Sequence, residues 1–133
     1  PQTMAPFPWH FGGQRYQNLF MDVNEIKKFC KIMKMKICND ISHSYLACNT
    51  FGWDYYNYIK KLLPHTAHYH ISDGSDHSGE GLQIGKGTID FNKVCKIIKS
   101  HNKQVTFIPE IWQGHTNNGA GFWQSLKILD GKI

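Results

Sequence analysis

Three short apolar runs in this chain each end beside side chains that can bind a metal ion. In chain order, these side chains are Asp40, His43, His70, Asp73 and Glu110. Carboxylate and imidazole groups together suit a divalent cation such as Mn²⁺, Mg²⁺, Co²⁺ or Zn²⁺. If the three runs are neighbouring parallel strands, their carboxyl ends meet at one edge of a sheet. The spacing therefore predicts one cation site built from several strand ends.

The segments around these residues predict alternating helices and strands. Asp22 followed by Glu25 has the spacing of a capping box, and apolar residues then recur at helical intervals up to residue 33. We expect strands at 36–40, 66–71 and 104–108, further helices at 53–63, 90–98 and 121–129, and loops at 1–21 and 73–87. This alternation is typical of parallel strands joined by crossover helices, so the predicted fold class is α/β.

Length and composition limit the possible classes of protein. The 133 residues, of which 41% are hydrophobic and 19% charged, fit one globular domain over 1–133 but are few for a complete (β/α)8 barrel. No apolar run approaches the ~18 residues of a membrane span. The net charge of +5 comes from scattered lysines, with Arg15 as the only arginine, which favours a solvated surface over nucleic-acid binding.

The four cysteines stand singly, with no C-x-x-C pair that would indicate a zinc ribbon or a redox motif. They are Cys30, Cys38, Cys48 and Cys95. Free thiols are typical of a reducing compartment, and no signal peptide opens the chain, so we expect a cytoplasmic protein.

Four pieces of the sequence, taken in order, resemble the xylose-isomerase-like TIM-barrel superfamily, which includes sugar-phosphate isomerases and epimerases and the endonuclease IV group. They are D-x-x-H at 40–43, H-x-x-D at 70–73, G-x-G-x-I-D-F at 85–91 and the strand that ends on Glu110. The resemblance extends over about residues 4–129. It implies a partial TIM barrel made of parallel (β/α) units, about the second half of a (β/α)8 barrel.

Two stretches, 79–85 and 107–115, are similar to a branch of sugar isomerases or epimerases found beside, or fused to, sialic-acid-type synthases of surface-sugar pathways. The resemblance implies a divalent metal, with Mn²⁺ favoured over Mg²⁺, Co²⁺ and Zn²⁺. By position, the metal ligands would be Asp40, His70 and Glu110. The catalytic residues would be Glu110 and His43, and the substrate contacts His43, Glu80, Gln83 and Asp73, with Asp73 also orienting His70.

The chain departs from the family pattern at its amino end. The family has a metal-binding glutamate at the end of strand four, just before the position of Ala5, where this sequence reads Pro-Gln-Thr-Met. The ligand is therefore either lost or replaced by Gln2 or Thr3. Strands one to four are also absent, so we expect self-association or pairing with the missing half of the barrel.

The leading hypothesis is a divalent-metal-dependent sugar or sugar-phosphate isomerase or epimerase. A zinc phosphodiesterase of the endonuclease IV kind is an alternative. Asp76 and His77 resemble its further ligands, but they lie too far upstream of Gly85, which favours a flexible-loop role for them. A non-catalytic binding or assembly module is a third hypothesis. Single residues also have simpler possible roles. Asp40 could be a helix cap, and His70 could be a core histidine. His68, on the same face of the strand, is the main competitor of His70 for the role of metal ligand. The aromatic side chains Trp9, Phe11, Trp112 and Trp123 fit either sugar stacking or packing.

Overall fold

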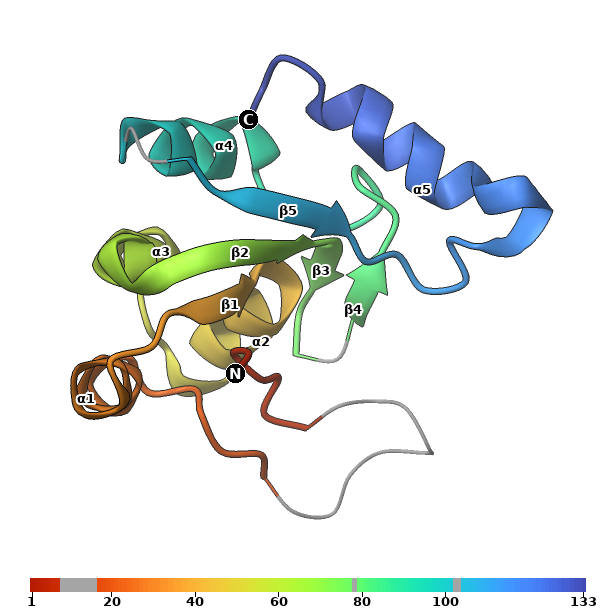
Figure 1. Cartoon of the computed structure of the whole chain (residues 1–133). Helices are drawn as coiled ribbons and strands as arrows, with labels where there is room; N and C mark the ends of the chain where they lie inside the picture. The colour runs from red at the N-terminus through yellow and green to blue at the C-terminus, as the bar shows by residue number, and fades with distance from the viewer. Residues whose placement is uncertain (8–16, 78, 102–103) are drawn as a thin grey trace.

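A parallel sheet of three strands forms the centre of the computed structural model, which describes residues 1–7, 17–77, 79–101 and 104–133. The strands are β1 (Ile37–Asp40), β2 (Thr66–Ile71) and β5 (Thr106–Pro109), in the order β1-β2-β5. Figure 1 shows them side by side, with all three arrowheads pointing toward the β3–β4 hairpin. The predicted α/β class with parallel strands is confirmed.

Helices precede, connect and follow the strands along the chain. They are α1 (Val23–Met33), α2 (Ile41–Phe51), α3 (Tyr55–Leu62), α4 (Phe91–Ser100) and α5 (Thr116–Leu129), with a 3-10 turn at Leu63–His65. Asp22 and Asp90 each accept backbone N–H groups at the start of α1 and α4. These caps satisfy helix N–H groups that have no partner within the helix, and the cap at Asp22 was predicted from the sequence.

The sheet has one buried face and one open face, because side chains alternate along a strand. On the buried face, Ile37, Tyr69 and Ile71 are at most 2% exposed and belong to the hydrophobic core. The opposite face carries Cys38 and Asp40 from β1, His68 and His70 from β2, and Thr106 and Ile108 from β5. Every candidate metal ligand on these strands therefore lies on the open face.

One helix and one hairpin were missed by the sequence prediction. Helix α2 has no apolar stripe: its buried residues include Ser42 and Ser44 as well as Ile41, Leu46 and Ala47, so its pattern does not repeat as an amphipathic helix does. The segment 73–87, predicted as a loop, contains the antiparallel hairpin of β3 (Asp73–Ser75) and β4 (Gly79–Leu82). Its short, Gly-rich strands lack the alternation by which a strand is recognised.

The ends of other elements differ slightly from the prediction. The helix predicted at 53–63 begins at Tyr55 and ends at Leu62, and Pro64 lies in the 3-10 turn that follows. In α5, the three residues 117–119 have positive φ angles of 51°, 59° and 78°, so regular helix starts after them, near the predicted start. Residues 8–16 of the predicted opening loop, which include Trp9 and Phe11, lie outside the described residues. In the described ranges, no helix has the length and apolar character needed to cross a bilayer.

Candidate metal centre

Asp40, His70 and Glu110 come together at the carboxyl ends of the three parallel strands. One donor atom from each lies within 4.8 Å of the other two. The Nδ1 atom of His70 is 2.7 Å from Oε2 of Glu110 and 3.9 Å from Oδ2 of Asp40. The strand register explains this arrangement, since Asp40 is paired with His70 and the backbone N–H of Glu110 donates to the carbonyl of Ile71.

The two carboxylate oxygens of Asp40 have different partners. Oδ1 accepts hydrogen bonds from the hydroxyl of Ser42 and from the backbone N–H of His43, both at 3.0 Å, and so caps α2. Oδ2 faces the open side of the sheet, 3.4 Å from Nδ1 of His43. Burial raises the pKa of Asp40, while the imidazole of His43 opposes that shift. Helix capping and cation binding are therefore compatible at this residue.

Gln2 is one of the two residues that could stand where the family has a strand-four glutamate. It forms a parallel bridge with Cys38 at the edge of β1. Its Nε2 donates to Oδ2 of Asp40 at 3.1 Å and lies 3.3 Å from Nδ1 of His43. Thr3, the other candidate, instead accepts the backbone N–H of Asp40 with its hydroxyl at 2.9 Å. A neutral amide thus stands beside the three candidate ligands.

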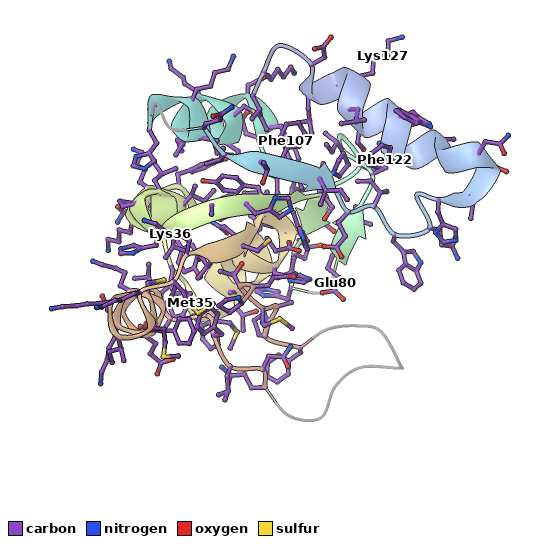
Figure 2. The ribbon with its side chains drawn as sticks, viewed as in Figure 1. Met35, Lys36, Glu80, Phe107, Phe122 and Lys127 are labelled. Atoms are coloured by element: carbon purple, nitrogen blue, oxygen red, sulfur yellow. The ribbon has the colours of Figure 1, made fainter. Side chains whose placement is uncertain are left out.

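His43 and Glu80 form a second pair at the same edge of the sheet. Nε2 of His43 is 3.5 Å from Oε2 of Glu80, which reaches in from β4. Figure 2 shows Glu80 on the hairpin beyond the ends of the parallel strands. The His43 ring is therefore held between Asp40 on one side and Glu80 on the other.

A cleft of about 590 Å³ lies at this edge of the sheet. Asp40, His43, Glu80 and Glu110 contribute to its wall, as do five residues that follow Glu110. Of these five, Trp112 was singled out from the sequence, and Ile111, Gln113, His115 and Thr116 were not. A signal for the missed residues up to His115 was present, because the stretch 107–115 carries the closer resemblance to sugar isomerases, but no periodicity showed which of its side chains face the cleft.

Two predicted substrate contacts have other partners in the structure. The carboxylate of Asp73, which is fully buried, accepts the backbone N–H groups of Gly74, Gly85 and Ile89 at 2.8–3.1 Å, and so closes the loop between β3 and α4. Gln83 donates through Nε2 to the hydroxyl of Ser125 in α5 at 2.8 Å. Neither residue lines the cleft. Their predicted contact with substrate, and the orientation of His70 by Asp73, stay predictions beside these hydrogen bonds.

The donor set fits a divalent cation. Nδ1 of His70 is buried and faces carboxylate oxygens of Glu110 and Asp40, and such a mixture of imidazole and carboxylate is shared by Mn²⁺, Co²⁺ and Zn²⁺ sites. The side chain of Glu110 is 55% exposed, which leaves room for a ligand beside it. Asp76 and His77, in contrast, lie on the exposed turn between β3 and β4, and neither belongs to a cluster of potential ligands among the described residues.

Known proteins similar to this chain include enzymes that act on sugars. A 3-keto-D-glucoside 4-epimerase from E. coli is 17% identical, with a TM-score of 0.62 over 98% of this chain and 44% of its own. An L-ribulose 3-epimerase is 12% identical, with a TM-score of 0.68 over 98% of this chain and 45% of its own. At these identities the similarity shows the fold, and this chain spans less than half the length of either structure.

Sequence comparison identifies the family. An uncharacterized protein of Methanocaldococcus jannaschii is 36% identical over 86 residues, which are 64% of this chain and 32% of that protein. The family described as "Xylose isomerase-like TIM barrel" matches residues 1–131. The chain therefore belongs to the xylose isomerase-like TIM-barrel family and forms part of such a barrel.

Proposed function

We propose that this chain is the site-bearing half of a divalent-metal-dependent sugar or sugar-phosphate isomerase or epimerase. The observation that carries the proposal is the convergence of Asp40, His70 and Glu110 on one point, with Asp40 and Glu110 in the wall of a cleft. Sugar epimerases among the structures of the same fold support the substrate class. The similarity of 107–115 to isomerases of surface-sugar pathways supports a role in surface carbohydrate synthesis, and the free cysteines suit the cytoplasm.

Metal binding, proton transfer and substrate contact can each be assigned to residues of this site. A cation held by Asp40, His70 and Glu110, with Mn²⁺ favoured, would polarise adjacent hydroxyl and carbonyl oxygens of a sugar. Glu110, with its exposed carboxylate, would take a proton from the hydroxyl-bearing carbon next to the carbonyl and return it. His43, held between Asp40 and Glu80, would hydrogen-bond a sugar hydroxyl.

Gln2 limits what this site can do. An amide cannot carry a proton between two carbons, so Gln2 cannot act as a second acid/base beside Glu110. Among the described residues in the cleft wall, the carboxylates are Asp40, Glu80 and Glu110, and Asp40 already caps α2. We infer that Glu110 is the main proton carrier and that Glu80 contacts the substrate through its pair with His43.

The open face of the sheet requires a partner. It exposes Ile108 to 43% and leaves the imidazole of His70 partly exposed, although the equivalent face of a closed barrel is packed. We propose that further barrel strands cover this face. They would come either from the other half-barrel or from a second copy of this chain. Light scattering of the purified chain separates the two, because self-pairing doubles the mass.

Manganese titration of the 133-residue chain tests the metal site directly. We expect binding that is lost in Glu110→Gln and in His70→Ala but kept in His65→Ala, a partly buried histidine in the 3-10 turn far from the cleft. Turnover is measured separately, as exchange of sugar C–H for deuterium in D₂O with a panel of ketoses, with and without a co-expressed amino-terminal half-barrel. Metal binding that survives Glu110→Gln, or exchange that survives it, would contradict the proposal.

A non-catalytic binding module is the second candidate, and the hydrogen bond from Gln2 to Asp40 favours it because an amide fills the place of a family ligand. It predicts sugar binding without deuterium exchange, even when the other half-barrel is present. The phosphodiesterase alternative has no comparable support, since Asp76 and His77 lie on the exposed turn.

A further inference from the structure

A second group of potential ligands lies on the open face, one step down the strands from the carboxylates. Cys38, His68 and His70 each offer a donor atom, and these atoms lie within 4.8 Å of one another. The register explains the cluster: Cys38 on β1 is directly paired with His68 on β2, and His70 is the next residue of β2 on the same face. The three donors therefore come from two adjacent, hydrogen-bonded strands.

The imidazole of His68 is already oriented as a ligand would be. Its Nδ1 is 2.7 Å from the hydroxyl of Thr106, its register partner on β5. A metal-binding histidine typically uses one ring nitrogen for such a contact, which fixes the ring and leaves the other nitrogen for the ion. The rings of His68 and His70 stand at 89° with centroids 5.3 Å apart, so they do not stack on each other's faces.

Cys38 differs from the other thiols of the chain. Cys30, Cys48 and Cys95 are at most 6% exposed and belong to the hydrophobic core. Cys38 is partly exposed, is free, and is the one cysteine that belongs to a ligand cluster among the described residues. Its strand position at the bridge to Gln2 directs it to the same open face as both histidines.

We propose that Cys38, His68 and His70 form a binding site for a thiophilic divalent cation, with Zn²⁺ as the ion. One sulfur and two imidazole nitrogens are a donor set that Zn²⁺ accepts in tetrahedral sites and that Mg²⁺ and Mn²⁺ disfavour. With bonds of about 2.3 Å to sulfur and 2.0–2.1 Å to nitrogen, the donors must move closer by roughly 1 Å, within reach of side-chain rotation. The fourth position is open to water or an exogenous ligand. On binding, the Cys38 thiol releases its proton to solvent as the zinc–sulfur bond forms.

His70 is common to this site and to the carboxylate site. A neutral imidazole has one nitrogen lone pair available for coordination, because the other ring nitrogen carries the proton. His70 therefore serves one cation at a time, and Zn²⁺ at Cys38 competes with Mn²⁺ at Glu110. The competition rests on the proposed function, whereas zinc binding at Cys38 does not.

Cobalt(II), used as a spectroscopic substitute for Zn²⁺, tests the site on the full 133-residue chain. We expect a sulfur-to-cobalt charge-transfer band in the near ultraviolet that is displaced by Zn²⁺. The band should disappear in Cys38→Ser, persist in Cys30→Ser, and persist in Glu110→Gln, which keeps all three ligands. Zinc affinity should fall in Cys38→Ser by more than the roughly 10–100-fold that loss of an outer hydrogen-bond partner costs. Absence of the band in the wild type, or its persistence in Cys38→Ser, would overturn the proposal.

Thiol alkylation gives a second test that needs no variant. Zinc should protect Cys38 from iodoacetamide, as mapped by peptide mass, while Mn²⁺ should not. Equal labelling of Cys38 with and without Zn²⁺ contradicts the site even if a variant fails to fold. If zinc protects Cys38 but does not displace Mn²⁺, the zinc site stands and the manganese site proposed at Glu110 is wrong.

Discussion

Nδ1 of His70 lies 2.7 Å from Oε2 of Glu110, across the β2–β5 pair of strands. The backbone continues the ladder for one residue beyond β5, because the N–H of Glu110 donates to the carbonyl of Ile71 at 3.0 Å. This places a carboxylate that is 55% exposed against a histidine on the neighbouring strand. The pair is thus held by backbone geometry, and an ion can replace the contact without rearranging the sheet.

Replacing Gln2 by Glu should strengthen cation binding. The change puts a carboxylate where an amide now donates to Asp40 at 3.1 Å, so it adds an anionic ligand. We expect Mn²⁺ affinity to rise about tenfold, or about 1.4 kcal/mol. Without metal the variant should melt at a lower temperature than the wild type, since two carboxylates then face each other. Gln17→Glu, at an exposed position, is the matched control. Calorimetric titration and melting curves measure both effects; unchanged affinity would mean that Gln2 is not at the cation site.

Replacing Asp40 by Asn should stabilise the metal-free chain near neutral pH while it abolishes cation binding. Burial raises the pKa of Asp40, so the folded state binds its proton more tightly than the unfolded state does. Stability then falls as the pH rises from the ordinary carboxyl range through the raised pKa, and it stays lower above that value. An asparagine oxygen can still cap α2 and carries no charge.

The measurement for Asp40→Asn is the unfolding midpoint against pH, with and without Mn²⁺. The midpoint of the wild type should fall as the pH rises from the ordinary carboxyl range through the raised pKa of Asp40, and the midpoint of the variant should not. Added Mn²⁺ should abolish the pH-dependent fall in the wild type and leave the variant unchanged. A variant less stable than the metal-free wild type at neutral pH would show that interactions with His43 and Gln2 outweigh the burial of the charge.

Asp73 should matter for stability rather than for binding. Its carboxylate accepts three backbone N–H groups, and its removal leaves these groups without their partner. Because each buried donor left unpaired costs about 1–3 kcal/mol, Asp73→Ala should lower the free energy of unfolding by on the order of 3 kcal/mol. Asp130→Ala, at an exposed position with a φ of −54°, should change it by less than about 0.5 kcal/mol. Denaturant unfolding gives both values, and equal effects would contradict this role for Asp73.

Trp112 should contact the sugar, whereas Trp123 should not. The two side chains are 61% and 62% exposed, but Trp112 lines the cleft and Trp123 does not. An aromatic contact contributes about 0.5–1.5 kcal/mol to the free energy of binding. Trp112→Ala should therefore weaken the binding of a ketose that the protein converts by up to about tenfold. Trp123→Ala should leave the affinity unchanged. Titration of both variants decides between sugar stacking and a purely surface role for Trp112.

Local chemistry made part of the fold predictable. Asp22 and Asp90 cap helices because a short carboxylate before an amphipathic stripe satisfies free N–H groups, wherever the helix lies in the molecule. Helix α2 was not predictable in this way. Its serines are buried by contacts with distant residues, as when Ser72 donates to the hydroxyl of Ser42 at 3.1 Å. No spacing within the helix records such a contact.

The sequence alone, through residue types at strand ends and their likeness to a family, determined that Asp40, His70 and Glu110 belong to one site. Only the tertiary structure decided what surrounds them. In the tertiary structure, Asp73 and Gln83 form hydrogen bonds within the protein. Gln2 donates a hydrogen bond to Asp40, and Cys38 is the register partner of His68. The physical reason is register: pairing between strands about thirty residues apart fixes which side chains meet, and no local pattern in the chain encodes it.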